Sequence, residues 1–269
     1  MNWKTFALPW SVTFILIWLS FSAALSRADD QLGMIQQRGT FRVGTEGTYP
    51  PFSFRGPDNQ LQGFDVDVAK EIAAKLGVKP EFITTEWSGI IAGLQAAKFD
   101  AIINQVAITP ERKQVVDFSL PYVYSTPELI ERRDDSRQFS SLEDLKGKKL
   151  GVGLGSNFET LAKSVSGIDV KTYPGASEYL SDLAAGRIDA ALNDSLMIGY
   201  LLKNASLPLR AGAVLDVGQR EVGIPIRKNN PKLLQAINDA VTALRREGVL
   251  AKLSLRWFGN DASKQAGPE

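Results

Sequence analysis

The sequence predicts an α/β protein of two similar lobes, each with a mainly parallel β-sheet and flanking helices. Short apolar, β-branched runs alternate with amphipathic helical segments along most of the chain, as in βαβ units. This alternation occurs in two successive blocks, and one stretch of the first block is repeated in the second. A chain of 269 residues is long enough for one large domain or two lobes.

The first block is predicted to contain three strands and two helices. The segment TFRVGTE is short, apolar and β-branched, as expected of a buried strand. The segment FDVDVAKEIAAKLG has an apolar stripe at helical spacing, acids in its first turn and Gly77 at its end, as expected of a helix. The predicted elements are strand 40–46, helix 64–77, strand 81–86, helix 88–98 and strand 99–105.

The second block shows the same alternation of strands and helices, and the sequence at its end is similar to the sequence at the end of the first block. LQAAKFDAIINQ (94–105) and LAAGRIDAALND (183–194) share Leu, Ala, Asp, Ala and Asn in register. Because the match occupies the equivalent place in both blocks, it favours two similar lobes over chance. The predicted elements are strand 148–155, helix 156–165, strand 168–173, helix 176–186, strand 187–194 and helix 195–203.

The remaining segments are predicted to connect and close the lobes. Residues 120–138 begin extended and apolar, with two prolines, and end in a charged loop, which fits a connection between lobes. Helices are expected at 230–248, where Asn230 and Pro231 form a start signal, and at 249–259. Residues 260–269 are expected to be disordered.

The amino-terminal segment is predicted to be a secretory signal peptide, residues 1–28. A basic start is followed by an uncharged stretch from Thr5 to Ser26 and a small-residue site, Ser-Arg-Ala. The alternative is an uncleaved membrane anchor, since the stretch is long enough to span a bilayer. Pro9, the Ser/Thr content and the Ser-Arg-Ala site favour cleavage, and the absence of Cys at the junction argues against a lipid anchor.

Composition excludes several classes of function. The chain has no His and no Cys, so it cannot form a Ser-His-Asp triad, a thiolate nucleophile or the usual zinc site. Removal of residues 1–28 takes away Lys4 and Arg27 and no acid, so the net charge of +1 becomes −1. Without a basic excess, nucleic-acid binding is not expected. No cofactor or metal ion is expected either.

Three strand ends carry polar groups that would suit a zwitterion. Arg112 lies in a first helical turn, where a cation is unfavourable unless an anion accompanies it. Ser156 and Asn157 follow a glycine-rich strand end that could hold an anion, and Asp194 ends another strand. Together they predict a carboxylate at Arg112, Ser156 and Asn157, and an ammonium group at Asp194.

Each feature also has a structural interpretation. The glycines of GVGLGSNF do not form the dinucleotide-binding pattern and are common in turns. Arg112 could pair with Glu111 or Asp117 at the surface, and Asp194 could cap the helix that follows it. Glu46 and Tyr49 could face a cleft, whereas Trp87 alone is more typical of a core.

Six segments resemble, in the same order, the polar amino-acid branch of the periplasmic solute-binding proteins of ABC importers, bacterial extracellular solute-binding protein family 3. They are VGTEGTYPPFSF, GFDVDVAKEIAAKLG, ITPERKQVVDFSLPY, LKGKKLGVGLGSN, GRIDAALND and RWFG. The resemblance implies a two-lobed type II periplasmic binding fold with two hinge strands, and a monomer that docks on an inner-membrane ABC permease with its ATPase. It places lobe 1 at 31–124 plus 219–259 and lobe 2 at 125–218.

The resemblance also implies ligand-binding residues. Arg112 matches the carboxylate clamp, Ser156 and Asn157 match the carboxylate donors of the second lobe, and Asp194 matches the ammonium acceptor. The other matching positions are Glu46, Tyr49 and Trp87 in the side-chain pocket, and Asn104, Gln105 and Ala107 at strand ends.

Within this family, EGTYPPFSF, INQVAIT and GVGLGSNFE are most similar to cystine-binding members, which predicts cystine as the preferred amino acid. Glu46 could meet the second ammonium group of cystine, but an acid at this position also occurs in arginine, histidine and glutamine binders. One rival is a periplasmic cyclohexadienyl or arogenate dehydratase on the same fold, with Glu46 or another carboxyl as general acid. A receptor sensor domain is the other, and it is disfavoured because no further membrane segment follows.

Overall fold

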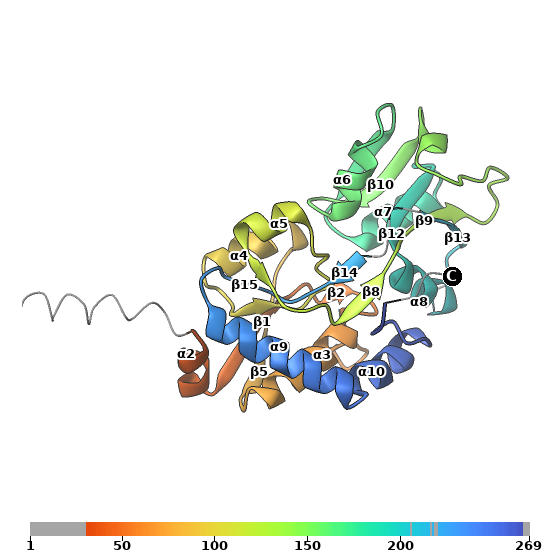
Figure 1. Ribbon diagram of the computed structural model, residues 1–269. Helices are drawn as coiled ribbons and strands as arrows, with labels where there is room; N and C mark the ends of the chain where they lie inside the picture. The colour runs from red at the N-terminus through yellow and green to blue at the C-terminus, as the bar shows by residue number, and fades with distance from the viewer. Residues whose placement is uncertain (1–30, 205, 216, 218–219, 266–269) are drawn as a thin grey trace, which may run out of the picture.

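The computed structural model describes residues 31–204, 206–215, 217 and 220–265, and it shows two α/β lobes (Figure 1). The predicted signal peptide, residues 1–28, lies outside these residues. Among the residues described, no helix has the length and apolar character needed to span a bilayer. Each lobe is built on a five-stranded sheet, so the alternation in the sequence predicts the fold class correctly.

The sheet of the first lobe consists, in spatial order, of β5 (Lys79–Thr84), β1 (Thr40–Thr45), β6 (Ala101–Ile102), β15 (Pro225–Ile226) and β7 (Asp117–Phe118). Of these, only β15 runs antiparallel to its neighbours. The helices of this lobe are α2 (Gln31–Arg38), α3 (Phe64–Lys75), α4 (Ile90–Gln95), α5 (Pro110–Val115), α9 (Pro231–Arg246) and α10 (Val249–Phe258). A small antiparallel sheet of β2 (Thr48–Tyr49), β3 (Ser53–Arg55) and β4 (Leu61–Gln62) follows β1.

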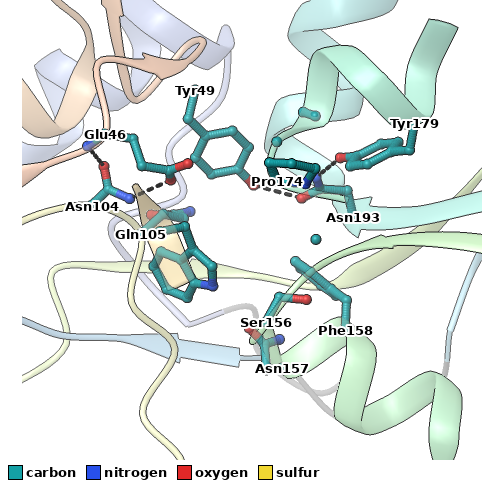
Figure 2. A pocket seen from close by; sticks show the side chains of 14 residues that line it. Glu46, Tyr49, Asn104, Gln105, Ser156, Asn157, Phe158, Pro174, Tyr179 and Asn193 are labelled. Atoms are coloured by element: carbon teal, nitrogen blue, oxygen red, sulfur yellow. Dashed lines mark hydrogen bonds between the residues drawn. The ribbon is translucent and has the colours of Figure 1, made fainter. Parts of the chain in front are cut away.

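The sheet of the second lobe repeats this order with β11 (Asp169–Tyr173), β10 (Lys149–Gly153), β12 (Ala190–Asp194), β9 (Pro127–Arg132) and β13 (Leu209–Val214). Here β9 is the strand that runs antiparallel to its neighbours. The helices of this lobe are α6 (Asn157–Lys163), α7 (Ala176–Ala184) and α8 (Ser195–Asn204). The carboxyl ends of β1, β6, β10 and β12 lead to residues that line one cavity, drawn from close by in Figure 2.

Two short strands connect the lobes as an antiparallel pair, β8 (Val123–Ser125) and β14 (Arg220–Val222). Figure 1 shows both strands running between the two sheets. The predicted boundary at 124/125 falls at β8, and the one at 218/219 lies outside the described residues. A type II fold with two hinge strands therefore describes the chain.

The carboxyl-terminal segment does not behave as the sequence suggests. Residues 260–265, for which disorder is predicted, pack back onto the protein, and residues 266–269 lie outside the described part. Ala262 and Ser263 are buried, and the hydroxyl of Ser254 in α10 bonds the backbone of Asn260 and Ala262. The carbonyl of Ala262 accepts the N–H of Tyr124 at 2.8 Å, so this segment lies against the hinge strand β8.

The predicted strand 99–105 is much shorter in the structure, where only Ala101–Ile102 pairs as β6. Beyond it the chain turns, because Gln105 adopts a left-handed conformation with φ 52°. The stretch 120–138 is not only a connection, since it contains β9, an interior strand of the second sheet. Such pairing depends on partners far along the chain, which periodicity alone does not show.

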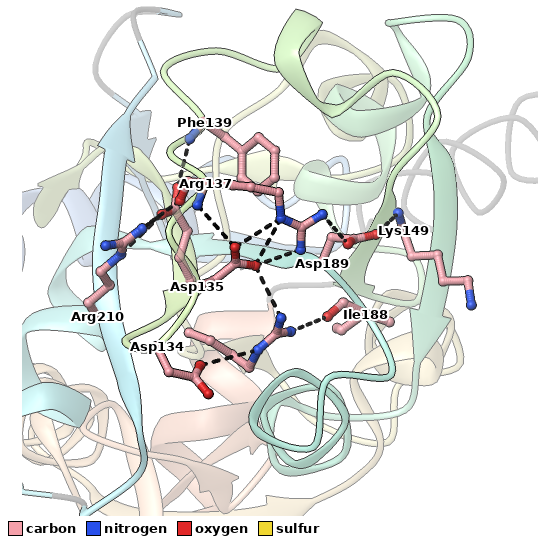
Figure 3. A network of polar contacts seen from close by, with 10 residues as sticks. Asp134, Asp135, Arg137, Phe139, Lys149, Ile188, Asp189 and Arg210 are labelled. Atoms are coloured by element: carbon pink, nitrogen blue, oxygen red, sulfur yellow. Dashed lines mark hydrogen bonds and ion pairs between the residues drawn. The ribbon is translucent and has the colours of Figure 1, made fainter.

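The internal repeat has a structural basis in two buried or half-buried aspartates. Asp100 accepts the backbone N–H of Arg42 in β1 at 2.8 Å and pairs with its guanidinium. Asp189 accepts the backbone N–H of Lys149 in β10 at 2.8 Å and pairs with Arg137 at 2.8 Å (Figure 3). Each aspartate precedes its own strand by one residue and fixes the beginning of the neighbouring strand, so the matching sequences do the same work in both lobes.

The core lies on both faces of the two sheets. In the first lobe Phe41 and Val43 of β1 pack with Ile72 of α3, and in the second Leu150 and Val152 pack on the α6 side. Each fully buried side chain of this kind contributes roughly 1.5–3 kcal/mol through removal from water. The strands that carry the cavity residues are thereby held by well-packed helices.

Candidate functional site

A cavity with about 480 Å³ of empty space, including its open mouth, lies between the lobes (Figure 2). Seven of the ten residues predicted from the sequence line it. They are Glu46, Tyr49, Trp87, Asn104, Gln105, Ser156 and Asn157. The remaining lining residues are Gly153, Phe158, Pro174, Gly175, Ala176, Tyr179 and Asn193.

Glu46 follows β1 and brings a carboxyl to the first-lobe wall of the cavity. Asn104 donates to its Oε2 at 2.7 Å, and within the described residues no Lys or Arg forms an ion pair with it. Burial raises the pKa of Glu46 to about 7, while the Asn104 bond lowers it and the nearby charge of Glu86 raises it further. Glu46 is therefore a carboxyl that would gain from a cationic neighbour.

The side-chain amide of Asn104 is engaged in hydrogen bonds within the first-lobe wall of the cavity. Its Oδ1 accepts from the Thr45 hydroxyl at 2.8 Å, the Glu46 N–H at 2.9 Å and the Ser53 hydroxyl at 2.9 Å. These three donors fix the amide orientation, so its Nδ2 points to Glu46. The strand-end position predicted to meet the ligand thus orients the acid that lines the cavity.

Arg112 lies in the first turn of α5, a helix with Thr109 as its N-cap and Pro110 as its first residue. Its guanidinium donates to the carbonyl of Ala107 at 2.9 Å and lies over the ring of Trp87, 5.2 Å from the centroid. Burial lowers the pKa of Arg112 to about 10, and the exposed Glu111 offsets this only in part. The predicted surface ion pairs are not found in the described residues, so this cation still lacks a carboxylate.

The guanidinium lines a second hollow that adjoins the cavity. Arg112 shares this hollow with Ser156 and Asn157, which line both spaces. Ala107 does not line either space, but its carbonyl orients Arg112, and its backbone bridges to Val222 of the hinge strand β14. The carboxylate position that the sequence predicts would lie where the two spaces meet.

Ser156 has a structural duty that the sequence does not reveal. Its hydroxyl accepts the N–H of Glu159 at 3.1 Å, and Glu159 in turn accepts the N–H of Gly155 at 2.6 Å. These bonds resemble a capping box and occupy the backbone N–H groups of Gly155 and Glu159, whereas the hydroxyl hydrogen of Ser156 is still able to donate to an anion. Asn157, the first residue of α6, lines the cavity beside it.

Asp194 ends β12 and is 4 % exposed. Its Oδ1 accepts the N–H of Leu196 at 2.9 Å, so the helix-capping alternative is correct. Its Oδ2 accepts from Ser125 at 2.5 Å and from the Gln105 side chain at 3.4 Å, and Asp194 lines neither the cavity nor the adjoining hollow. Burial raises its pKa to about 6. All of these donors are neutral, and among the described residues no Lys or Arg pairs with the Asp194 carboxyl.

Asn193 and Tyr179 are the most informative residues that the sequence analysis missed. Tyr49 of the first lobe donates to Asn193 Oδ1 at 2.6 Å, and Asn193 Nδ2 bonds the hydroxyl of Tyr179 (Figure 2). A direct hydrogen bond therefore joins the lobes across the cavity. The repeat contained the signal, because it aligns Asn193 with Asn104, the amide at the equivalent strand end.

The chain matches bacterial extracellular solute-binding proteins, family 3, over residues 41–260. It is 43% identical to the L-cystine-binding protein TcyJ of Escherichia coli across 87% of this chain and 88% of that protein. It is 35% identical to the L-arginine-binding protein of Pseudomonas aeruginosa across 82% of this chain and 88% of that protein.

Among solved structures, the ancestral amino acid-binding protein AncCDT-1, a precursor of cyclohexadienyl dehydratase, has a TM-score of 0.79 and 38% identity, covering 85% of this chain and 99% of that one. An ancestral arginine-binding protein bound to arginine has a TM-score of 0.78 and 42% identity, covering 82% and 99%. These relatives are binding proteins, not enzymes, which disfavours the dehydratase alternative. The chain belongs to the bacterial extracellular solute-binding proteins of family 3, and the relatives it matches include several amino-acid-binding proteins.

Proposed function

We propose that this protein binds an amino acid between its lobes, with L-cystine preferred, and delivers it to an ABC permease. The carboxylate would meet Arg112 with Ser156 and Asn157, and the ammonium group would meet Asp194. The observation that carries the proposal is the separation of unpaired charges around the cleft. Among the described residues, Arg112 is a partly buried cation without a carboxylate, while Glu46, partly buried, and Asp194, buried, are carboxyls without a cation.

A zwitterion offers each of these groups its missing partner. Buried charges are costly unless they are paired, so a ligand with both charges recovers much of the desolvation cost of the empty site. The proposed permease follows from the family, whose relatives include a probable amino-acid ABC transporter-binding protein of Haemophilus influenzae. The periplasm is the proposed location, with residues 1–28 removed on export.

The preference for cystine rests on Glu46 and on the similarity to TcyJ. Cystine has two ammonium groups, of which one would meet Asp194 and the other Glu46. Arginine is the second candidate, because its guanidinium would also suit Glu46 and two relatives bind arginine. A calorimetric titration of ligand-stripped protein with L-cystine, L-arginine, L-glutamine and L-glutamate tests both. Micromolar or tighter binding of cystine alone is expected, whereas no binding of any of them would contradict the proposed function.

Glu46→Gln is expected to weaken cystine binding by about tenfold or more, because a neutral amide cannot balance the second ammonium group. Calorimetry measures the change directly. Glu86→Gln is the matched control, since Glu86 is an exposed acid close enough to influence Glu46 and lies outside the cavity lining. Equal affinities of wild type and Glu46→Gln would remove the argument for a second ammonium subsite.

Asp194→Asn is expected to weaken binding of every amino acid by about tenfold or more while keeping the thermal stability of the empty protein. The amide oxygen can still accept the Leu196 N–H, so the cap on α8 survives. Thermal melting without ligand and calorimetry with ligand separate the two roles. A fall in melting temperature with unchanged affinity would show that Asp194 serves only as a cap.

A further inference from the structure

The hinge strand β8 is held near each end by a hydroxyl that bonds to a buried carboxyl. Tyr122, the residue before β8, donates to Asp65 of α3 at 2.8 Å. Ser125, the last residue of β8, donates to Asp194 at the end of β12 at 2.5 Å. Since α3 belongs to the first lobe and β12 to the second, each lobe accepts a hydrogen bond from one end of this strand through a carboxyl.

Asp65 is the more unusual of these two hinge carboxyls, which we define as Asp65 and Asp194. It is fully buried in the first turn of α3, and its Oδ2 has no hydrogen-bond partner in the part of the chain that the structure describes. Neither hinge carboxyl forms an ion pair with a Lys or Arg of the described residues. A buried carboxylate oxygen without a partner is strongly unfavourable, so this environment favours the neutral, protonated form.

The groups that face the hinge carboxyls are acids, phenols and neutral donors. Asp65 and Asp194 also influence each other, and the Gln105 loop lies between them, with its side-chain Nε2 on Asp194. Two carboxyls in one low-dielectric region resist simultaneous ionisation. The surrounding groups are Tyr122 and Ser125 at the hinge, Tyr49 of β2, Gln105, Glu128 of β9 and Tyr179 of α7.

The electrostatics agree with the geometry. Burial raises the pKa of Asp65 to about 7, although hydrogen bonds from Tyr122 and from the backbone of Gln105 lower it. Burial likewise raises the pKa of Asp194 to about 6, against hydrogen bonds from Ser125, Leu196 and Gln105. At a pH between these values the empty site holds about one proton on the pair.

We propose that the hinge carboxyls hold a proton while the cleft is empty and release it to solvent when an ammonium group binds at Asp194. This inference rests on the proposed function, since it needs an ammonium group at that position. Asp65 does not line the cavity, so it acts through Asp194 and the Tyr122 end of the hinge as a positioning residue. The arriving cation replaces the charge of the departing proton, and amino-acid binding becomes weaker in acid.

The sign of the stability change follows from linkage. The folded, empty protein binds protons more tightly than the unfolded chain, because the pKa of each hinge carboxyl is raised. Their contribution to stability is therefore fully present below about pH 4 and is lost as the pH rises through about 6 and 7. An ammonium ligand compensates the ionised carboxyls, so the stabilisation by ligand should grow over the same range.

The test is calorimetry with L-cystine, and with L-arginine, in buffers of different ionisation enthalpy between pH 5.5 and pH 8. All proteins in this test carry Glu46→Gln, because Glu46 also has a pKa of about 7 and would release a proton of its own to the second cation of either ligand. The protein that is wild type at the hinge should then release between about half a proton and one proton near pH 6.5. Its affinity should fall by about tenfold or more from pH 8 to pH 5.5, since a pKa lowered by one unit on binding changes affinity by up to about tenfold. Asp65→Asn should still bind at pH 8 and release less than half as many protons. Its loss of affinity from pH 8 to pH 5.5 should be about tenfold smaller than that of wild type.

Asp67→Asn is the matched control, because Asp67 lies on the same helix but already has cationic and indole partners, Lys70 and Trp257. It should release protons as wild type does. If Asp65→Asn does not fold, Tyr122→Phe removes the donor that lowers the pKa of Asp65 and should move the fall in affinity to higher pH. Proton release by Asp65→Asn equal to that of wild type, or a flat pH profile in wild type, would overturn the proposal.

A failure of the proposed function has a different signature. If neither amino acid binds at any pH, the clamp assignment fails, and the empty protein still decides the role of Asp65. Denaturant unfolding of the empty wild type should then lose stability from pH 5 to pH 8, and Asp65→Asn should lose less. Parallel pH profiles for the two proteins would show that Asp65 carries no proton in the folded state.

Discussion

Arg112→Ala should abolish most amino-acid binding, with a loss of affinity of about a hundredfold or more. A hydrogen bond to a charged group contributes about 1.5–3 kcal/mol, and about 1.4 kcal/mol corresponds to tenfold in affinity. A carboxylate that accepts two such bonds from the guanidinium would lose both. The side chain is already placed for this purpose, since the Ala107 carbonyl and the Trp87 ring hold it beside the cavity.

The design of this experiment separates charge from geometry. Arg112→Lys keeps the cation but loses the planar fork, so an intermediate loss is expected. Arg256→Ala removes an exposed cation of α10 and should leave affinity unchanged. The titrations should use the amino acid that binds wild type in the calorimetric panel. Affinity within twofold of wild type for Arg112→Ala would show that the carboxylate binds elsewhere.

Gly63→Ala should destabilise the protein by about 3 kcal/mol or more, the largest stability effect expected of a small substitution here. Gly63 precedes α3 with φ 135°, a conformation that L-residues rarely adopt. A Cβ at this position would lie 2.2 Å from the carbonyl oxygen of Phe52, far inside contact distance. The clash involves backbone on both sides, so no rotamer change relieves it.

The matched control for this variant lies at the other end of the same helix. Gly77 has φ 74° and no atom within 4 Å of an added Cβ, so Gly77→Ala tests backbone strain without a clash. A loss of about 1–2 kcal/mol is expected there. Denaturant unfolding with circular dichroism measures both variants. Similar losses for the two would mean that the loop of Phe52 moves aside and that the position of Asp65 in α3 is less constrained than it looks.

The sequence predicts the fold well because the repeat and the hydrophobic periodicity are local signals. β1, α3, β10, α7 and α9 begin and end within a few residues of their predicted limits. The short strand β15 escapes prediction, since its pairing with β6 joins residues more than a hundred positions apart. The same reason explains the tail, where contacts of Ala262 with the hinge override a composition typical of disorder.

The sequence predicts which residues line the candidate site better than it predicts the hydrogen bonds among them. Strand-end reasoning and the family resemblance together find Glu46, Asn104, Gln105 and Asn157 around one cavity. They do not reveal that the amide oxygen of Asn104 accepts three hydrogen bonds, because the donors come from segments that only folding brings together. The contact between Tyr49 and Asn193 depends on how the lobes approach each other, and no single segment of sequence carries that information.

The return of residues 260–265 to the hinge has a practical consequence for biosensors. A fluorescent protein joined at the carboxyl end would be tethered a few residues from Ala262, which bonds the middle of β8. Such an attachment would act directly on β8, so it would report changes in hinge geometry and would also disturb them. An attachment ahead of α2, which packs on α9 in the first lobe, would leave β8 untouched.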